Sequence, residues 1–159
     1  MTPIRYEPFQ KFLPKRSASD TLLLRQKMLA EGCVDPLRVW TETGYLLDGY
    51  NRLDICETDG IPYTVVGVSL PDEDAAFTWI IENQLSRRNL TDAERTYFIG
   101  HQYLQRKQQE GGDRKSLRTA CVVIGETAEI IAKEHDVSPR TVQNAAEFAA
   151  AVDAHEAVE

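Results

Sequence analysis

The spacing of apolar residues along the chain predicts helices and short strands in a mixed order. Prolines punctuate the apolar positions of residues 3–14, which favours an edge strand followed by a loop. Residues 17–30 have helical spacing and end before Gly32, a typical helix stop. The β-rich runs 37–41 and 45–47 flank a Thr-Gly turn, which predicts a hairpin. The candidate caps and the apolar stripe of the helix are Ser19, Asp20, Leu22, Leu23, Met28 and Leu29.

The middle of the chain alternates between helix and strand patterns. Residues 51–59 predict a short helix closed by Gly60, and residues 62–68 predict a buried strand. A longer helix is expected over residues 72–85. The next helix opens at Thr91, whose side chain and that of Glu94 make a capping box. These elements together predict an α/β (α+β) fold.

A glycine-rich break at residues 110–116 separates this part from a helical C-terminal segment. From Glu126 onward, two short helices meet at a tight turn around Asp136, a residue type that tolerates the left-handed conformation. Ser138 caps the second helix and Pro139 occupies its first position. The residues expected in the shared core are Ile131, Ala132, Val137, Val142 and Ala145.

This segment resembles a helix-turn-helix, in which the second helix enters the DNA major groove. Its outward positions are expected to be Ser138, Arg140, Thr141, Gln143 and Asn144. Arginine suits guanine edges, whereas glutamine and asparagine suit adenine. The competing interpretation is a helical hairpin that packs only against the rest of the protein. Residues 145–158 are increasingly acidic and are expected to point away from DNA.

The amino-acid composition restricts the kinds of partner that the chain can bind. The chain has 159 residues, 42% of them hydrophobic and 27% charged, as in ordinary globular proteins. Its net charge of −7 argues against sequence-independent binding of nucleic acid over the whole surface, so any DNA contact needs a local basic face. Basic residues do cluster, at Arg87, Arg88, Arg106, Lys107, Arg114, Lys115 and Arg118.

Two further classes of protein are disfavoured. No stretch reaches the roughly 18 apolar residues of a membrane span and no signal peptide is visible, so we expect a cytoplasmic protein without a membrane partner. The three cysteines, Cys33, Cys56 and Cys121, show no Cys-x-x-Cys pair, which disfavours structural zinc and a disulfide framework.

The predicted hairpin ends at Asp48-Gly49 and passes directly into a helix that carries Arg52. A strand that turns into a helix at glycine leaves backbone N–H groups at the helix N-terminus, and these suit an anion such as phosphate. Arg52 can add a planar cation that pairs with phosphate oxygens. A tight glycine corner with a surface arginine remains the alternative.

Two motifs in this order resemble the N-terminal domain of the ParB/sulfiredoxin superfamily, from about residue 4 to about residue 108. The first is Gly49-Tyr50-Asn51-Arg52, and the second is the run Glu82-Asn83-Gln84-Leu85-Ser86-Arg87-Arg88-Asn89-Leu90-Thr91. With the helix-turn-helix behind them, the whole chain looks like a ParB-type partition protein. The resemblance implies a ParB/sulfiredoxin-like domain over residues 1–110, with a small mixed sheet and helices. It also implies a linker over residues 111–125 and an all-helical DNA-binding segment over residues 126–159.

In this family the two motifs bind a nucleoside triphosphate, chiefly CTP, with Mg²⁺. The resemblance implies that residues 49–52 contact the nucleotide and that Glu82 and Asn83 lie at its metal and phosphate end. Arg87 and Arg88 would contact phosphate or DNA. DNA phosphates would also be held by Arg114, Lys115 and Arg118. ParB relatives often dimerise, so a homodimer is among the expected states.

The first motif departs from the family pattern. ParB usually has two adjacent arginines where this chain has Asn51-Arg52, and the missing cation should weaken triphosphate binding. Asp48 resembles the Asp-Gly-His-x-Arg form of relatives that act as small-molecule kinases, which makes Asp48 and Glu82 catalytic candidates with ATP or ADP. Sulfiredoxin chemistry is excluded, because its nucleophilic cysteine would fall at Tyr50.

Three functions therefore stay open from the sequence. The first is a ParB-like DNA-binding protein of partition or regulatory type, gated by a nucleotide and encoded on a plasmid, phage or integrated element. The second is an enzyme, either a nucleotide-dependent phosphotransferase or an NTPase of CTPase type. The third is a transcriptional regulator whose nucleotide pocket has decayed.

Overall fold

The computed structural model describes residues 2–87, 89–110 and 117–156, apart from the side chains of residues 109–110, 117–125 and 156. The chain divides into two compact units, Met1–Ile80 and Ile81–Glu159, and each is described by itself. None of the described helices is long and apolar enough to span a lipid bilayer.

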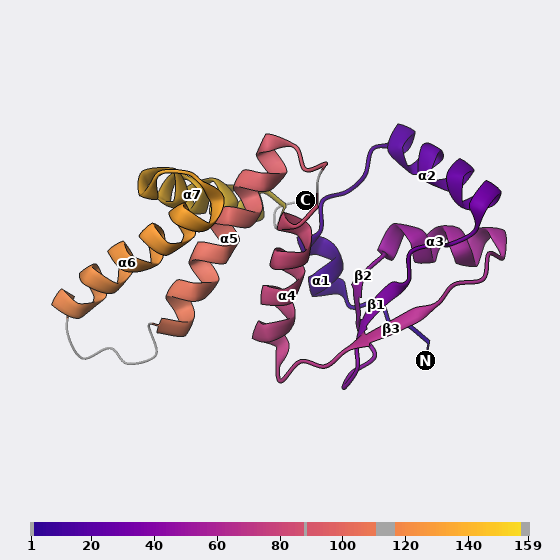
Figure 1. Ribbon diagram of the computed structural model, residues 1–159, viewed down its shortest axis with the longest axis horizontal. Helices are drawn as coiled ribbons and strands as arrows, with labels where there is room; N and C mark the ends of the chain where they lie inside the picture. The colour runs from indigo at the N-terminus through magenta and orange to yellow at the C-terminus, as the bar shows by residue number, and fades with distance from the viewer. Residues whose placement is uncertain (1, 88, 111–116, 157–159) are drawn as a thin grey trace. The chain divides into compact units, whose positions relative to one another are not determined.

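The first unit is built on a small mixed sheet (Figure 1). Its strands are β1 (Leu37–Trp40), β2 (Leu46–Asp48) and β3 (Val65–Val68), in the spatial order β2-β1-β3. β1 pairs antiparallel with β2 and parallel with β3. The predicted hairpin and the predicted mixed sheet are both confirmed.

Four helices accompany this sheet: α1 (Glu7–Phe12), α2 (Ala18–Glu31), α3 (Tyr50–Asp59) and α4 (Glu73–Leu85), the last of which continues into the second unit. The predicted edge strand over residues 3–14 is wrong in its main part. Only Ile4 forms an isolated bridge, with Tyr45, and the residues after it are helical. Pro8 lies in the first turn of α1, where its missing N–H removes no hydrogen bond.

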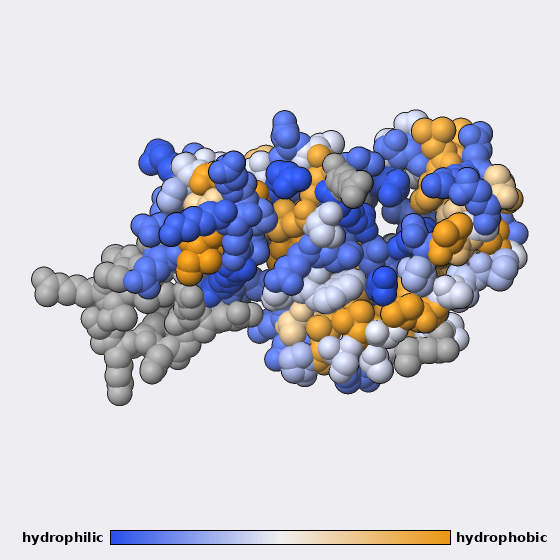
Figure 2. Space-filling view, in the orientation of Figure 1, coloured by the Kyte–Doolittle hydropathy of each residue, from blue (hydrophilic) through white to orange (hydrophobic). Residues whose placement is uncertain are grey.

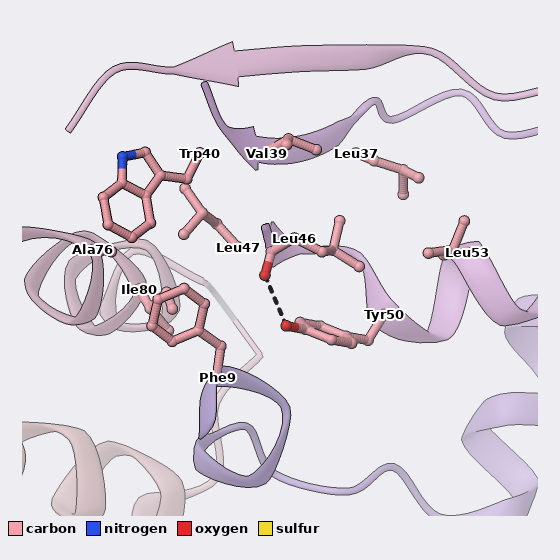
Figure 3. Close-up of a cluster of buried hydrophobic side chains, with 10 residues drawn as sticks. All are labelled: Phe9, Leu37, Val39, Trp40, Leu46, Leu47, Tyr50, Leu53, Ala76 and Ile80. Carbon is pink, nitrogen blue, oxygen red and sulfur yellow. Dashed lines mark hydrogen bonds between the residues drawn. The ribbon is translucent and has the colours of Figure 1, made fainter. Parts of the chain in front are cut away.

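The core of the first unit lies between the sheet, α1, α3 and the first part of α4 (Figure 3). Phe9 and Leu46 are fully buried, and Tyr50 is nearly so. The Tyr50 hydroxyl donates a hydrogen bond of 2.7 Å to the Leu46 carbonyl, which ties the start of α3 to β2. The other members of this cluster are Leu37, Val39, Trp40, Leu47, Leu53, Ala76 and Ile80.

The apolar runs of β3 and α2 are less buried than predicted. In the described residues β3 pairs only with β1, and its Val66 and Gly67 are exposed. Of the stripe predicted for α2 only Met28 is buried, where it packs beside Ile55 and Cys56 of α3. The remaining stripe residues, Leu22, Leu23 and Leu29, are 54%, 64% and 58% exposed, and Figure 2 shows apolar atoms at the surface over α2.

The second unit contains three long helices: α5 (Asp92–Glu110), α6 (Leu117–His135) and α7 (Pro139–Glu156). α5 and α7 cross closely at Gly100, where an added Cβ would collide with the Ala145 carbonyl and lie 2.9 Å from the Ala149 Cβ. The predicted capping box is confirmed, because the Glu94 carboxylate accepts from the Thr91 N–H at 2.8 Å and the Thr91 hydroxyl accepts from the Glu94 N–H at 3.2 Å.

α5 shares a core with α6 and α7, and the three helices belong to the second compact unit. α6 begins at Leu117, so residues 117–125 of the predicted linker are helical, while residues 111–116 lie outside the described part of the chain. The core residues that α5 shares with the other two helices are Ile99, Tyr103, Ala128, Ile131, Ala132, Val142, Ala145 and Ala146.

Candidate functional site

α6 and α7 are joined by a turn of three residues (Figure 1). Asp136 has a φ of 55°, the left-handed conformation that the sequence predicted at this place. The Val137 N–H then donates to the Ala132 carbonyl at 2.9 Å, and the Val137 side chain packs on the core of the unit. The turn therefore reverses the chain at a fixed angle and places the start of α7 at the surface.

Ser138 caps α7, as predicted. Its hydroxyl oxygen accepts from the Thr141 N–H at 3.1 Å, and the Ser138 and Thr141 hydroxyls are 2.8 Å apart. Both side chains are exposed, but each is engaged with the other. These two side chains therefore hold the N-terminus of α7.

The two faces of α7 differ sharply in chemistry. Val142, Ala145 and Ala149 are buried against the core of the unit. Arg140, Gln143 and Asn144 are exposed, and among the described residues none of these three has a hydrogen-bond or ion-pair partner. The helix thus presents one arginine and two amides that are available to an external ligand.

A side-chain network that the sequence did not reveal anchors the end of α6 to α5. Gln102 of α5 is buried, and its amide nitrogen donates to Glu134 at 3.3 Å while its oxygen lies 2.8 Å from His135 Nε2. This orientation requires the proton of His135 on Nε2. Arg106 adds a bond of 3.0 Å to Glu134. Burial lowers the pKa of His135, so the neutral ring is favoured at this joint.

A second set of contacts holds α7 to α5. The Tyr97 hydroxyl donates to Asp153 at 2.8 Å, and His101 Nε2 lies 3.2 Å from the other oxygen of the same carboxylate. Burial lowers the pKa of His101, and the nearby Asp153 carboxylate opposes this shift. These contacts hold the C-terminal part of α7 against α5, whereas the Gln102 network holds the end of α6 just before the turn.

The N-terminus of α3 is a second candidate site, in the first unit. Gly49 has a φ of 105°, and a Cβ there would lie 2.6 Å from Leu37 Cδ2 and 3.2 Å from Arg52 Nη2. Its N-cap residue, Gly49, has no side chain with which to cap α3, and no acidic residue lies in the first turn of the helix. A helix end of this kind can bind an anion through its backbone N–H groups.

The side chains around this helix end carry both signs of charge. Arg52 Nη2 lies 2.9 Å from the Asp48 carboxylate, and Nη1 lies 3.4 Å from the Asp35 carbonyl and 3.6 Å from the Asp35 carboxylate. The guanidinium is held in place but partly neutralised. Tyr50 lies in the core, where burial raises its pKa to about 12, so only its backbone can face a ligand.

The second motif lies at the end of α4, in the second unit. Glu82 and Arg87 are exposed, and Asn83 is half-buried with its carbonyl accepting from the Ser86 hydroxyl at 2.7 Å. Gln84 is buried, and its amide nitrogen has no hydrogen-bond partner among the described residues. A buried amide of this kind can donate to an oxygen of a bound ligand.

The side chains of the remaining basic residues predicted to contact DNA lie outside the described part of the structure. Arg88, Arg114 and Lys115 lie outside the described residues, and Arg118 lies in α6 in the part whose side chains are not described. Across the described residues no three His, Cys, Asp or Glu side chains are grouped in a way that could hold a metal ion.

Comparison with known proteins identifies the fold. No protein-family model matches the chain, and no curated protein sequence matches it. Two solved structures of a pNOB8-like ParB N-domain do match. One, in a C2221 crystal form, has a TM-score of 0.69 and 16% sequence identity, with 91% of this chain and 64% of that chain covered. The other has a TM-score of 0.63 and 18% identity, with 91% and 60% covered.

The chain therefore has the fold of a ParB N-domain, as the two motifs and the order of elements predicted. It spans less than two thirds of the length of either solved chain.

Proposed function

We propose that this protein is a ParB-like, sequence-specific DNA-binding protein of partition or regulatory type. The observation that carries the proposal is α7, which begins at a three-residue turn and presents Arg140, Gln143 and Asn144 on an exposed face. A helix of this kind enters the major groove with its N-terminal residues toward the base edges. The similarity to the ParB N-domain structures supports the same assignment.

In this proposal bases and phosphates are contacted by different residues. Arg140 can make two hydrogen bonds to guanine O6 and N7, and Gln143 and Asn144 can each make two to adenine N6 and N7. Phosphates are held by the basic clusters, which supply local positive charge on a chain of net charge −7. These are Arg87, Arg88, Arg114, Lys115 and Arg118.

Selection from a random double-stranded DNA library on the full chain tests this function. We expect a defined motif to be enriched, and affinity for it to exceed affinity for scrambled DNA about 10³-fold or more at physiological salt. Binding that is equal for all sequences and vanishes with added salt would contradict the proposal, because it would come from phosphate contacts alone.

A second function, nucleotide binding, is favoured by the N-terminus of α3. It has no capping side chain, a left-handed Gly49 and the fixed guanidinium of Arg52. The nucleotide would be CTP, or ATP or ADP, with Mg²⁺. The backbone N–H groups at the start of α3 and the guanidinium of Arg52 would hold its phosphates. Mg²⁺ bound to the phosphates would neutralise part of their negative charge, and it needs few ligands from the protein.

Calorimetric titration with CTP, ATP, ADP and GTP, each with Mg²⁺, tests this second function. We expect micromolar binding of one nucleotide and a loss of at least about tenfold in affinity for Arg52→Ala, because the variant removes a charge-assisted contact. Arg25→Ala is the matched control, since Arg25 is bonded to Asp59 at the opposite end of α3. If no nucleotide binds, or if both variants bind equally, the α3 site is not used in this way.

A further inference from the structure

Glu147 lies on the same exposed face of α7 as the residues proposed to read DNA. Arg140, Asn144 and Glu147 follow one another at i, i+4 and i+7, a spacing that places their side chains in one stripe along a helix. All three are exposed, while Val142 and Ala146 are buried on the opposite side. The acidic part of α7 thus begins on this face.

The charge of Glu147 is not compensated within the second unit. One turn away on either side lie Gln143, Asn144, Ala150 and Ala151, none of which is a cation. Within the part of the chain that the structure describes, the carboxylate has neither a hydrogen bond nor an ion pair. The carboxylate of Glu147 is therefore exposed to solvent, with no cation bonded to it among the described residues.

A negative charge in a DNA groove is repelled by phosphates on both strands unless a base donates a hydrogen bond to it. In the major groove the donors are the amino groups of cytosine N4 and adenine N6. Adenine presents the acceptor N7 beside its amino group, which repels a carboxylate, whereas cytosine presents no acceptor of its own there. Cytosine is therefore the base that suits Glu147.

We propose that Glu147 is a specificity-determining residue that accepts a hydrogen bond from cytosine N4 in the target site. The inference rests on the proposed DNA-binding function and adds to it a base and a position. Arg140 and Glu147 are seven residues apart, or about 10.5 Å along a helix. At about 3.4 Å per base pair, a helix that follows the groove sets the cytosine about three base pairs from the guanine read by Arg140.

Random-library selection with Glu147→Ala and Glu147→Gln, alongside the unaltered chain, tests the inference. We expect the unaltered chain to require cytosine at one position and Glu147→Ala to lose that preference while it keeps the rest of the motif. Glu147→Gln should change the preference to adenine, because an amide matches adenine N6 and N7. On single sites, replacing the cytosine should weaken the unaltered chain about 5- to 150-fold and Glu147→Ala little.

Glu31→Ala is the control, because Glu31 is an exposed glutamate of α2 in the first unit and its removal changes the net charge equally. A motif that Glu147→Ala shares at every position with the unaltered chain would overturn the inference and leave the DNA-binding function standing. The absence of any motif for the unaltered chain would overturn the function itself.

Discussion

Gly49 has two properties that no other residue type could combine at its position. Its φ of 105° lies in the region that side chains rarely adopt, and its α-carbon faces Leu37 Cδ2 so closely that a Cβ would lie 2.6 Å away. The turn that exposes the N-terminus of α3 thus depends on a missing side chain. The sequence predicted this corner from the Asp-Gly pair, but the contact with Leu37 depends on the fold.

We expect Gly49→Ala to lower the free energy of unfolding by about 2–5 kcal/mol, from left-handed backbone strain of about 1–2 kcal/mol and overpacking of about 1–3 kcal/mol. Urea denaturation followed by circular dichroism measures this. The control is Gly60→Ala, since Gly60 also has a positive φ, of 68°, but no atom within 4 Å of its Cβ position. Equal losses in both variants would mean that the contact with Leu37 contributes nothing.

At the scale of single residues, the parts of the site that local sequence determines were predicted correctly. Asp136, Ser138 and Pro139 mark the turn and the start of α7 because turn and cap preferences act over three or four residues. Two assignments needed the structure. Tyr50 belongs to the core, and Glu147 lies on the face that carries Arg140.

At the scale of elements, α5 holds α6 and α7 in place. It meets α7 at Gly100, and its Gln102 holds His135 at the end of α6. Neither contact follows from periodicity, because each joins residues more than thirty positions apart. The sequence therefore predicted α5 as a helix with its capping box, but not these two contacts.

Two histidines make the contacts of α5 sensitive to pH. Burial lowers the pKa values of His101 and His135 below their usual value in the unfolded chain, about 6.5. Below that pH the unfolded chain binds protons that the folded chain does not, so stability is complete above about 6.5 and falls as the pH falls toward the lower, folded pKa values. We expect the urea midpoint to decrease between pH 7.5 and pH 5.5.

His101→Gln should flatten this pH dependence, because the variant has no ring to protonate at that position. His155→Gln, which changes an exposed histidine near the end of α7, is the control and should leave the dependence as it is. An unchanged slope in His101→Gln would show that His101 does not contribute to it.

At the scale of the whole molecule, the order of elements and the two motifs predicted the fold, and the structure agrees. The motifs lie in different units, Gly49 to Arg52 in the first and Glu82 to Arg87 in the second. The exposure of Leu22, Leu23 and Leu29 was not predicted, because helical spacing says which residues share a face and not whether that face meets another element.

Net charge restricts the proposed DNA binding but does not locate it. Under the proposed function, a chain of net charge −7 has to concentrate its nucleic-acid contacts on a small surface. α7 offers such a surface, with Arg140, Gln143 and Asn144 exposed beside a fixed turn. On this account base contacts, rather than total charge, make the larger contribution to sequence discrimination.

The measurement that tests this claim most directly is the affinity of Arg140→Ala for the selected site and for scrambled DNA, by fluorescence anisotropy at fixed salt. We expect a loss of about 1–3 kcal/mol on the selected site and little change on scrambled DNA, because a bidentate base contact is removed. Arg16→Ala, an exposed arginine of the first unit, should change neither. Full retention of sequence-specific affinity in Arg140→Ala would contradict the assignment of α7 as the recognition helix.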